Sequence, residues 1–234
     1  MIIYEYEDCR VAEEKDSDVC IIQQDFDFYR IPLEMKKQYL QGREVVSIKQ
    51  NDDNLVILII VIGTILCTLT TYFSSGNYIL VDNNVILATL FLLINIPLHE
   101  IGHIIFLKLF SKDAKIRVGV TFFFIYPAFY VDTSYSYLCP KYKRMCIYLA
   151  GNFMNCIFLL IVYFFFPQFI NYCYIIISNI LVNFVPIIKS DGYYAMMTFL
   201  NKYKISKNRK EEYLEDFVRG LIMFIFMSGL SYIF

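Results

Sequence analysis

The sequence predicts a mainly α-helical, polytopic membrane protein with about five transmembrane helices, a membrane-embedded β-hairpin and a small N-terminal α+β cytoplasmic segment. Three observations support this fold class. Hydrophobic residues make up 58% of the 234 residues and charged residues only 18%, which is more apolar than is typical of soluble domains. Polar residues gather in 1–53, whereas long uncharged runs dominate the rest of the chain. Basic and non-basic loops alternate along those runs.

Five segments are candidates to cross a membrane, because a spanning helix needs about 20 apolar residues. The second candidate reaches this length only if His99, Glu100 and His103 lie inside it. The last candidate is shorter than the others. The segments are 54–73, 85–110, 145–166, 169–188 and 217–234.

Loop charges predict the orientation of these spans. The first and third loops, 74–84 and 167–171, contain no Lys or Arg, whereas the loops 111–144 and 189–210 are basic. Cytoplasmic loops carry the excess of basic residues in membrane proteins. We therefore expect a multi-pass protein of the cell membrane, in contact with the lipid bilayer, with a cytoplasmic N-terminus and an extracytoplasmic C-terminus.

Two shorter regions have strand character. Residues 117–132 are rich in Val, Phe, Tyr and Thr around a Tyr-Pro-Ala break, and are too short to cross twice as helices. They predict a β-hairpin that dips into the membrane face. Residues 1–50 predict a small cytoplasmic α+β unit with strands in 2–6 and 19–31 and a helix that stops at Gly42. Residues 54–234 would then form the membrane domain.

Charge and cysteine content exclude several classes. The net charge of −1 gives no global basic field for nucleic acid. The N-terminus lacks the basic-then-apolar pattern of a cleaved signal peptide. Seven cysteines without a CxxC pair argue for reduced thiols rather than a disulfide framework.

The stretch PLHEIGH holds both histidines of the chain. His99 and His103 are four residues apart, so they lie on one face of a helix, about 6 Å apart along its axis. This spacing allows two imidazoles to bind one Zn²⁺, and Glu100 can then act as the general base on a zinc-activated water. Ordinary packing is the alternative, but ionisable residues inside a membrane-length segment are costly and usually functional.

A catalytic zinc takes three protein ligands and a water. The chain has no third histidine, so the third ligand must be Asp, Glu or Cys. Asp191 is the best candidate, because the loop charges bring the end of the fourth span to the depth of His103. The alternative for Asp191 is a helix-end turn residue, since Asp-Gly is a common turn dipeptide.

Three motifs together resemble the site-2-protease-type intramembrane metalloproteases. HEIGH is similar to the HExGH of that family, and Asn183, Pro186, Asp191 and Gly192 match its Asn-x-x-Pro and Asp-Gly at the same internal spacing. AGNFMN, 150–155, resembles its Ala-Gly-Pro-x-x-Asn, with Asn152 in place of proline. The resemblance covers about residues 85–195.

The resemblance implies roles for individual residues. His99, His103 and Asp191 would be zinc ligands and Glu100 the base, while Asn155 and Asn183 would hold the substrate backbone or the oxyanion. The alternative for both asparagines is hydrogen bonding between helices.

A further stretch, YPAFYVDTS, resembles the Pro-x-x-Tyr-Val-Asp-x-Ser of bacterial peptide zinc metalloproteases found beside peptide-modification and export genes. Asp132 in this stretch is a candidate for an alternative ligand or a substrate contact, and the other interpretation is that it caps the hairpin turn. Residues 1–50 resemble only a shortened leader-binding domain. The resemblance implies as partners a peptide or membrane-protein substrate and a peptide-modifying enzyme or ABC exporter encoded nearby.

The predicted function is zinc-dependent intramembrane hydrolysis of a peptide bond in a hydrophobic or membrane-associated peptide. Compact size favours maturation of a small bacteriocin- or pheromone-like precursor. The alternatives are regulated intramembrane proteolysis of a membrane-anchored regulator and a non-proteolytic peptide-export or immunity protein. The hairpin 117–132 offers an edge onto which an unwound substrate could add as a strand.

Overall fold

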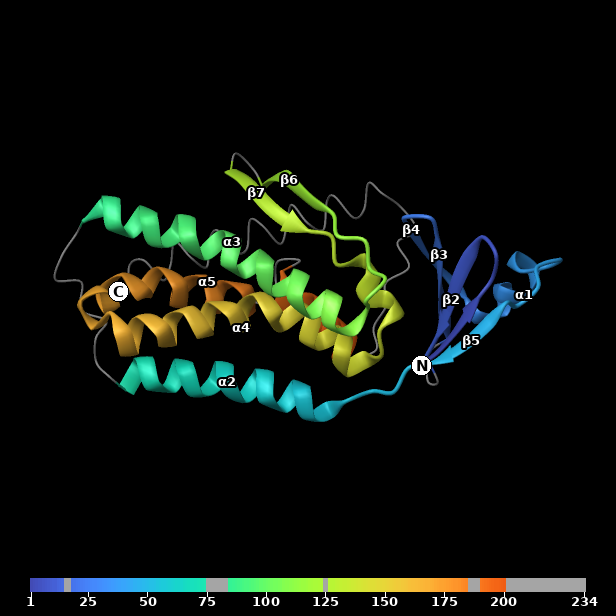
Figure 1. Ribbon diagram of the computed structural model, residues 1–234, viewed down its shortest axis with the longest axis horizontal. Helices are drawn as coiled ribbons and strands as arrows, with labels where there is room; N and C mark the ends of the chain where they lie inside the picture. The colour runs from blue at the N-terminus through green and yellow to red at the C-terminus, as the bar shows by residue number, and fades with distance from the viewer. Residues whose placement is uncertain (15–17, 75–83, 124–125, 185–189, 201–234) are drawn as a thin grey trace.

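The computed structural model describes residues 1–14, 18–74, 84–123, 126–184 and 190–200. The protein is elongated, with an N-terminal β-sheet at one end and a bundle of long helices at the other (Figure 1). A two-stranded hairpin lies along the side of the bundle, over helix α3 (Figure 1). The sheet, the hairpin base and the start of helix α4 meet at the same end of the bundle.

The N-terminal sheet has five antiparallel strands in the order β4-β3-β2-β1-β5. The Glu5 carboxylate ties the edge strand to its neighbour, because it accepts hydrogen bonds from Ser47 at 2.5 Å and Lys49 at 2.9 Å. These contacts, that from Ser47 first, hold the pKa of Glu5 below its usual range. The strands are β1 Ile2–Glu5, β2 Cys9–Glu13, β3 Val19–Gln24, β4 Asp27–Pro32 and β5 Ser47–Gln50.

This sheet confirms the α+β character of 1–50 and changes its details. The predicted strand region 19–31 is two strands, β3 and β4, separated by a turn in which Asp25 has φ 53°. The predicted helix is a 3-10 turn, η1 Leu33–Met35, followed by one α-helical turn, α1 Lys36–Tyr39. The helix ends at Tyr39, before the predicted stop, and Gly42 lies in the turn that follows, with φ +82°, a conformation that glycine adopts without steric cost.

Within the described residues, three helices are long and apolar enough to cross a membrane, and all three coincide with predicted spans. They are α2 Leu55–Ser74, α3 Val85–Phe110 and α4 Lys141–Phe165. Asn54 caps α2 by accepting a hydrogen bond from the backbone N–H of Val56 at 3.0 Å. Asp53 accepts from the first turn of α4, at 3.0 Å from the N–H of Tyr142, so α2 and α4 begin at the same level.

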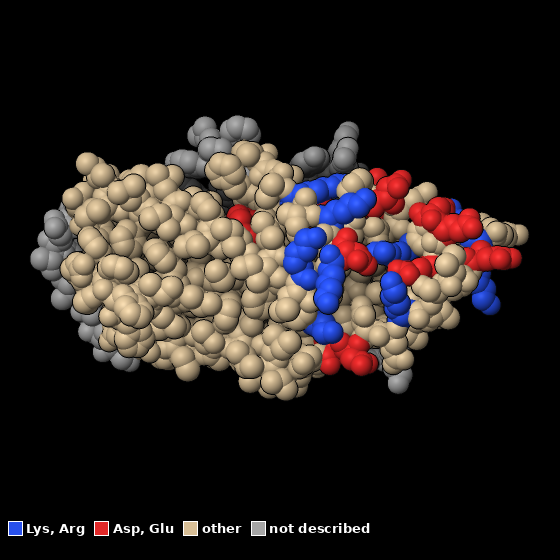
Figure 2. Space-filling model, viewed as in Figure 1, with Lys and Arg blue, Asp and Glu red and all other residues tan. Residues whose placement is uncertain are grey.

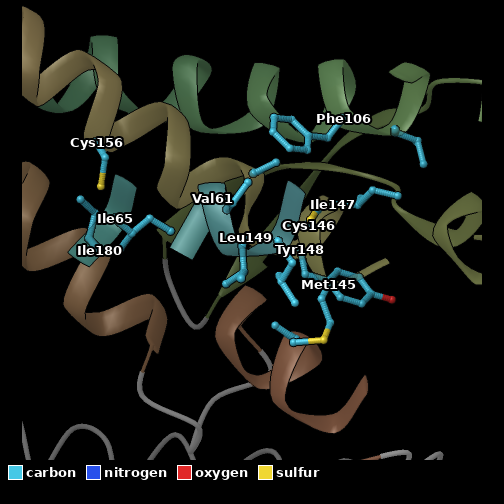
Figure 3. Packing of buried hydrophobic residues seen from close by; sticks show 14 of the residues in the cluster. Val61, Ile65, Phe106, Met145, Cys146, Ile147, Tyr148, Leu149, Cys156 and Ile180 are labelled. Atoms are coloured by element: carbon cyan, nitrogen blue, oxygen red, sulfur yellow. The ribbon is translucent and has the colours of Figure 1, made fainter. Parts of the chain in front are cut away.

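Helix α4 is the centre of the bundle. It is mostly buried, with α2, α3, α5 and α6 packed around it. Figure 3 shows Ile65 of α2, Cys156 of α4 and Ile180 of α5 meeting in this core. In contrast, α2 and α3 expose many large apolar side chains, among them Ile59 and Leu93. Such extended apolar faces suit a lipid surrounding.

The fourth predicted span differs from the prediction. Residues 169–188 do not form one continuous helix, because the 3-10 helix η3 Pro167–Cys173 precedes the eleven-residue α5 Tyr174–Phe184. Residues 185–189 and the fifth predicted span, 217–234, lie outside the described residues. A further helix, α6 Asp191–Phe199, packs against α4 and α5.

The predicted hairpin is present, as β6 Val118–Phe123 and β7 Tyr126–Val131. The N–H of Asp132 donates to the carbonyl of Arg117 at 2.9 Å, so this pair is a hydrogen-bonded pair of the ladder. Val118 and Val131 are therefore a pair that is not hydrogen-bonded to each other. The same holds for every second residue of β7 counted back from Val131, and the N–H groups of these residues point away from β6. Pro127 occupies one of these positions, where the missing N–H costs no ladder bond.

Basic side chains form a band between the apolar bundle and the N-terminal sheet (Figure 2). The described part of this band comes from the end of α3, the loop that follows it and the start of α4. Its members are Lys108, Lys112, Lys115, Arg117, Lys141 and Lys143. The band is consistent with a membrane boundary at this level.

Arg144 joins the sheet and the bundle at the 3-10 helix η2, Ser134–Leu138. Its guanidinium is fully buried and donates to the carbonyls of Ser136 at 3.2 Å and Cys139 at 2.9 Å. It also lies 3.7 Å from the carboxylate of Glu14 in the N-terminal part. Because these carbonyls are buried, loss of the guanidinium would leave several polar groups without a donor.

We predict that Arg144→Leu destabilises the protein by about 3 kcal/mol, since buried carbonyls and Glu14 then lose their charged partner. Glu14→Gln keeps the carbonyl contacts and should cost less than about 1 kcal/mol. Thermal unfolding of the two purified variants in the same detergent tests this. Equal melting temperatures for the two variants would contradict it.

Candidate metal centre

The two histidines of α3 face helix α4 and are almost completely buried. The Nδ1 of His103 lies 2.8 Å from the backbone carbonyl of Ile147. A carbonyl only accepts hydrogen bonds, so this Nδ1 carries the proton and Nε2 presents its lone pair. His103 is therefore held in the tautomer that a metal ligand needs.

Asp191 approaches the same point from the first residue of α6. Its Oδ2 lies 2.8 Å from Nε2 of His99 and 3.3 Å from Nε2 of His103, and the two Nε2 atoms are 3.4 Å apart. The prediction that Asp191 shares the depth of the histidines thus agrees with the geometry. Among the described residues, these three form the one cluster of His, Cys, Asp or Glu whose ligand atoms converge.

These separations fit a zinc ion. Zinc binds nitrogen and carboxylate oxygen at about 2.0–2.2 Å in tetrahedral geometry, which separates two ligand atoms by about 3.3 Å. Two of the observed separations, 3.3 and 3.4 Å, match this value, whereas the 2.8 Å between Nε2 of His99 and Oδ2 of Asp191 is a hydrogen-bond distance that would widen by about 0.5 Å around the ion. Two imidazoles and one carboxylate also form a donor set that catalytic zinc sites use.

Two glycines allow the ligand helix to approach α4. A Cβ at Gly102 would lie 2.5 Å from the carbonyl oxygen of Ala150, and a Cβ at Gly151 would collide with the imidazole of His99. Small residues at both positions therefore let the backbones pack closely and leave room for the ring. Gly192 has a similar role, because its Cβ would collide with the Asn183 carbonyl at the end of α5. Gly192 thus allows the start of α6 to pack closely against the end of α5.

The Glu100 carboxylate contacts the hairpin. Its Oε2 accepts a hydrogen bond from the backbone N–H of Val131 at 2.8 Å. This N–H is one of those that β7 directs away from β6, so the end of β7 lies against α3 at the candidate base.

An open cleft of about 500 Å³ adjoins both the ligands and Glu100. Its walls are mostly aromatic and polar. The tyrosines in its lining, such as Tyr148 and Tyr194 with ring centroids 5.6 Å apart, were not predicted, because aromatic residues occur throughout this chain. The lining residues are Glu100, His103, Tyr130, Val131, Asp132, Thr133, Ser134, Tyr137, Tyr148, Asp191 and Tyr194.

The three predicted substrate-contact residues have different surroundings. Asn155 is buried, with Nδ2 3.1 Å from Nδ1 of His99. Asn183 donates to Oδ1 of Asn152 at 3.3 Å, which joins α5 to α4. Asp132 accepts from the N–H of Ser134 at 2.9 Å and so caps the turn after β7, while it also lines the cleft. Their contacts with substrate stay predictions.

The contact between Asn183 and Asn152 involves the position at which the stretch 150–155 differs from the Ala-Gly-Pro-x-x-Asn motif that it resembles. Asn152 replaces the proline of that motif and is fully buried on α4. Its side chain supplies the acceptor for Asn183, which a proline could not do. Pro186, the other residue of the motif near Asn183, lies outside the described residues.

Comparison with known proteins gives a partial match. The chain is 30% identical over 136 residues to the "Putative peptide zinc metalloprotease protein YydH" of Bacillus subtilis (strain 168), covering 55% of this chain and 54% of that protein. The chain thus spans about half the length of the curated relative it matches. No family model matches, and no solved structure matches.

We predict that Gly151→Ala reduces zinc affinity at least about ten-fold, because the added methyl group displaces the His99 ring from its ligand position. Gly63→Ala is a matched control on α2, where a Cβ would meet nothing within 4 Å. It should leave zinc affinity unchanged and, if anything, stabilise its helix by up to about 1 kcal/mol. Zinc competition with a chromophoric chelator measures both. Unchanged affinity in Gly151→Ala would show that the ring does not need this space.

Proposed function

We propose that this chain is a zinc-dependent intramembrane endopeptidase that hydrolyses a peptide bond in a hydrophobic or membrane-associated peptide. The observation that carries the proposal is the convergence of His99, His103 and Asp191 within zinc-ligand separations, on membrane-length helix α3 and its neighbour α6. The partial similarity to a protein named as a peptide zinc metalloprotease supports the same chemistry.

Each residue of the site has a distinct task. His99, His103 and Asp191 would hold the zinc, which when bound activates a water and polarises the peptide carbonyl. Glu100, which lines the cleft beside His103, accepts the proton of the attacking water and passes it to the leaving amine. The N–H of Val131 orients the Glu100 carboxylate and so fixes the direction from which the base acts.

The edge of β7 that faces away from β6 is the proposed docking site for the substrate. A peptide bond inside a helix is hidden within the helical hydrogen bonds, so the substrate must be extended for hydrolysis. Strand addition supplies backbone hydrogen bonds for such an extended segment. Phe129 and Val131 direct their N–H groups to this edge, and that of Val131 already donates to Glu100. The position at Phe129 is therefore the one we assign to substrate.

The proposed substrate class is a small peptide precursor of bacteriocin or pheromone type. The aromatic lining of the cleft favours an apolar segment next to the scissile bond. We propose that the reaction occurs near the cytoplasmic face, since the cleft is lined by residues 130–134, which belong to the basic loop 111–144. A peptide-modifying enzyme or exporter encoded nearby is a partner that this role would require.

We predict that Glu100→Gln abolishes cleavage, or slows it by about 10²–10⁴-fold, while zinc stays bound, because an amide cannot accept the proton. His99→Ala should lose both zinc and cleavage. Co-expression of the full chain with the peptides encoded beside its gene, followed by mass spectrometry, detects the products. Normal processing by Glu100→Gln would refute zinc proteolysis through this base and would favour an export or immunity role.

We predict that Phe129→Pro abolishes cleavage and leaves zinc content intact, since it removes an N–H from the docking edge. Val120→Pro is a matched control. Val120 is the register partner of Phe129 and is similarly exposed, but its N–H faces the opposite edge of the hairpin, on β6. It should retain cleavage. Equal activity of the two variants, measured with the same peptide, would exclude β7 as the docking edge.

A further inference from the structure

Asn155 lies directly behind a metal ligand. It is on α4, fully buried, and its Nδ2 is 3.1 Å from Nδ1 of His99. Its other amide atom, Oδ1, is also buried and has no hydrogen-bond partner among the described residues. This orientation leaves part of the hydrogen-bonding capacity of the amide unused. A buried oxygen without a hydrogen-bond donor costs free energy of folding.

The two ligand histidines are supported differently. Nδ1 of His103 faces a backbone carbonyl, which can only accept, whereas Nδ1 of His99 faces an amide that can donate or accept. An imidazole that offers Nε2 to a metal carries its proton on Nδ1 and needs an acceptor there. For Asn155 a half-turn of the amide exchanges Nδ2 and Oδ1 and supplies this acceptor.

We propose that Asn155 is a positioning residue for His99, in which the amide oxygen accepts the Nδ1–H of the ligand tautomer. With the amide nitrogen towards the ring, as here, the hydrogen bond instead fits the tautomer in which Nε2–H donates to Asp191 at 2.8 Å. Turning the amide therefore selects between a ring that hydrogen-bonds to Asp191 and a ring that binds metal. When the amide is turned so that Oδ1 of Asn155 faces His99, Oδ1 accepts the Nδ1–H and so gains the hydrogen-bond partner that it lacks here.

This inference rests on the proposed zinc site and deepens it. It differs from the substrate or oxyanion role in one measurable respect. A positioning residue changes zinc affinity, because partners behind a ligand usually contribute about 10–100-fold to metal affinity. A substrate contact changes cleavage and leaves zinc affinity as it was.

The test compares three full-length variants in detergent by zinc competition with a chromophoric chelator. Asn155→Leu has a similar volume without hydrogen-bonding groups, and should bind zinc about 10–100-fold more weakly. Asn155→Asp retains an acceptor for Nδ1–H and should bind zinc at least as tightly as the native protein. Thr68→Val removes a buried hydroxyl of α2 that donates to the Thr64 carbonyl and contacts none of the three ligand residues, and it should leave the affinity within about three-fold.

The outcomes separate the two proposals. Native-like affinity in Asn155→Leu, or equal losses in the Leu and Asp variants, would overturn the positioning role alone. If Asn155→Leu does not fold, a loss of more than about ten-fold in Asn155→Asp overturns it. No zinc binding by the native protein would overturn the zinc site and this inference together. The expected affinity pattern without any peptide cleavage would leave the positioning role intact and refute the protease.

Discussion

The close approach of α3 and α4 is the constraint on which the rest of the site depends. Gly102 and Gly151 remove the side chains that would separate the two helices. The His99 ring therefore lies against the α4 backbone, and His103 reaches the Ile147 carbonyl one turn further along. In an apolar bundle this proximity also provides the hydrogen-bond partners that buried imidazoles need, since few others are available there.

The same central helix supplies most of the polar support. Asn152 accepts from Asn183 of α5, and Asn155 contacts His99 of α3, so two amides one turn apart connect α4 to both neighbours. Asp191 then reaches the ligands because Gly192 lets the start of α6 pack against the end of α5. The candidate centre is thus assembled from three helices that meet at α4, rather than from one motif.

The sequence predicted the parts that carry strong local chemistry. The proximity of His99, His103 and Asp191, the spans of α2, α3 and α4, and the presence of the hairpin agree with the structure, while the ligand roles and the membrane position of the hairpin stay predictions. The short strands β2 and β5 were missed, because four or five mixed residues have no clear alternation. The break between η3 and α5 was missed because a continuous apolar run indicates that a segment is buried, but does not indicate where a helix begins or ends.

The orientation of side chains was the least predictable feature, because it depends on contacts between distant segments. Nothing local indicates that the N–H of Val131 is directed at Glu100, 31 residues earlier, or that Asn155 lies behind His99. Both contacts follow from the register of the hairpin and from the packing of α4. They divide the candidate site into one part on the helices, with His99, His103 and Asp191, and a second part in which Glu100 contacts β7. A substrate strand on β7 would lie along the boundary between these two parts, where the base and the ligands can reach the same peptide bond.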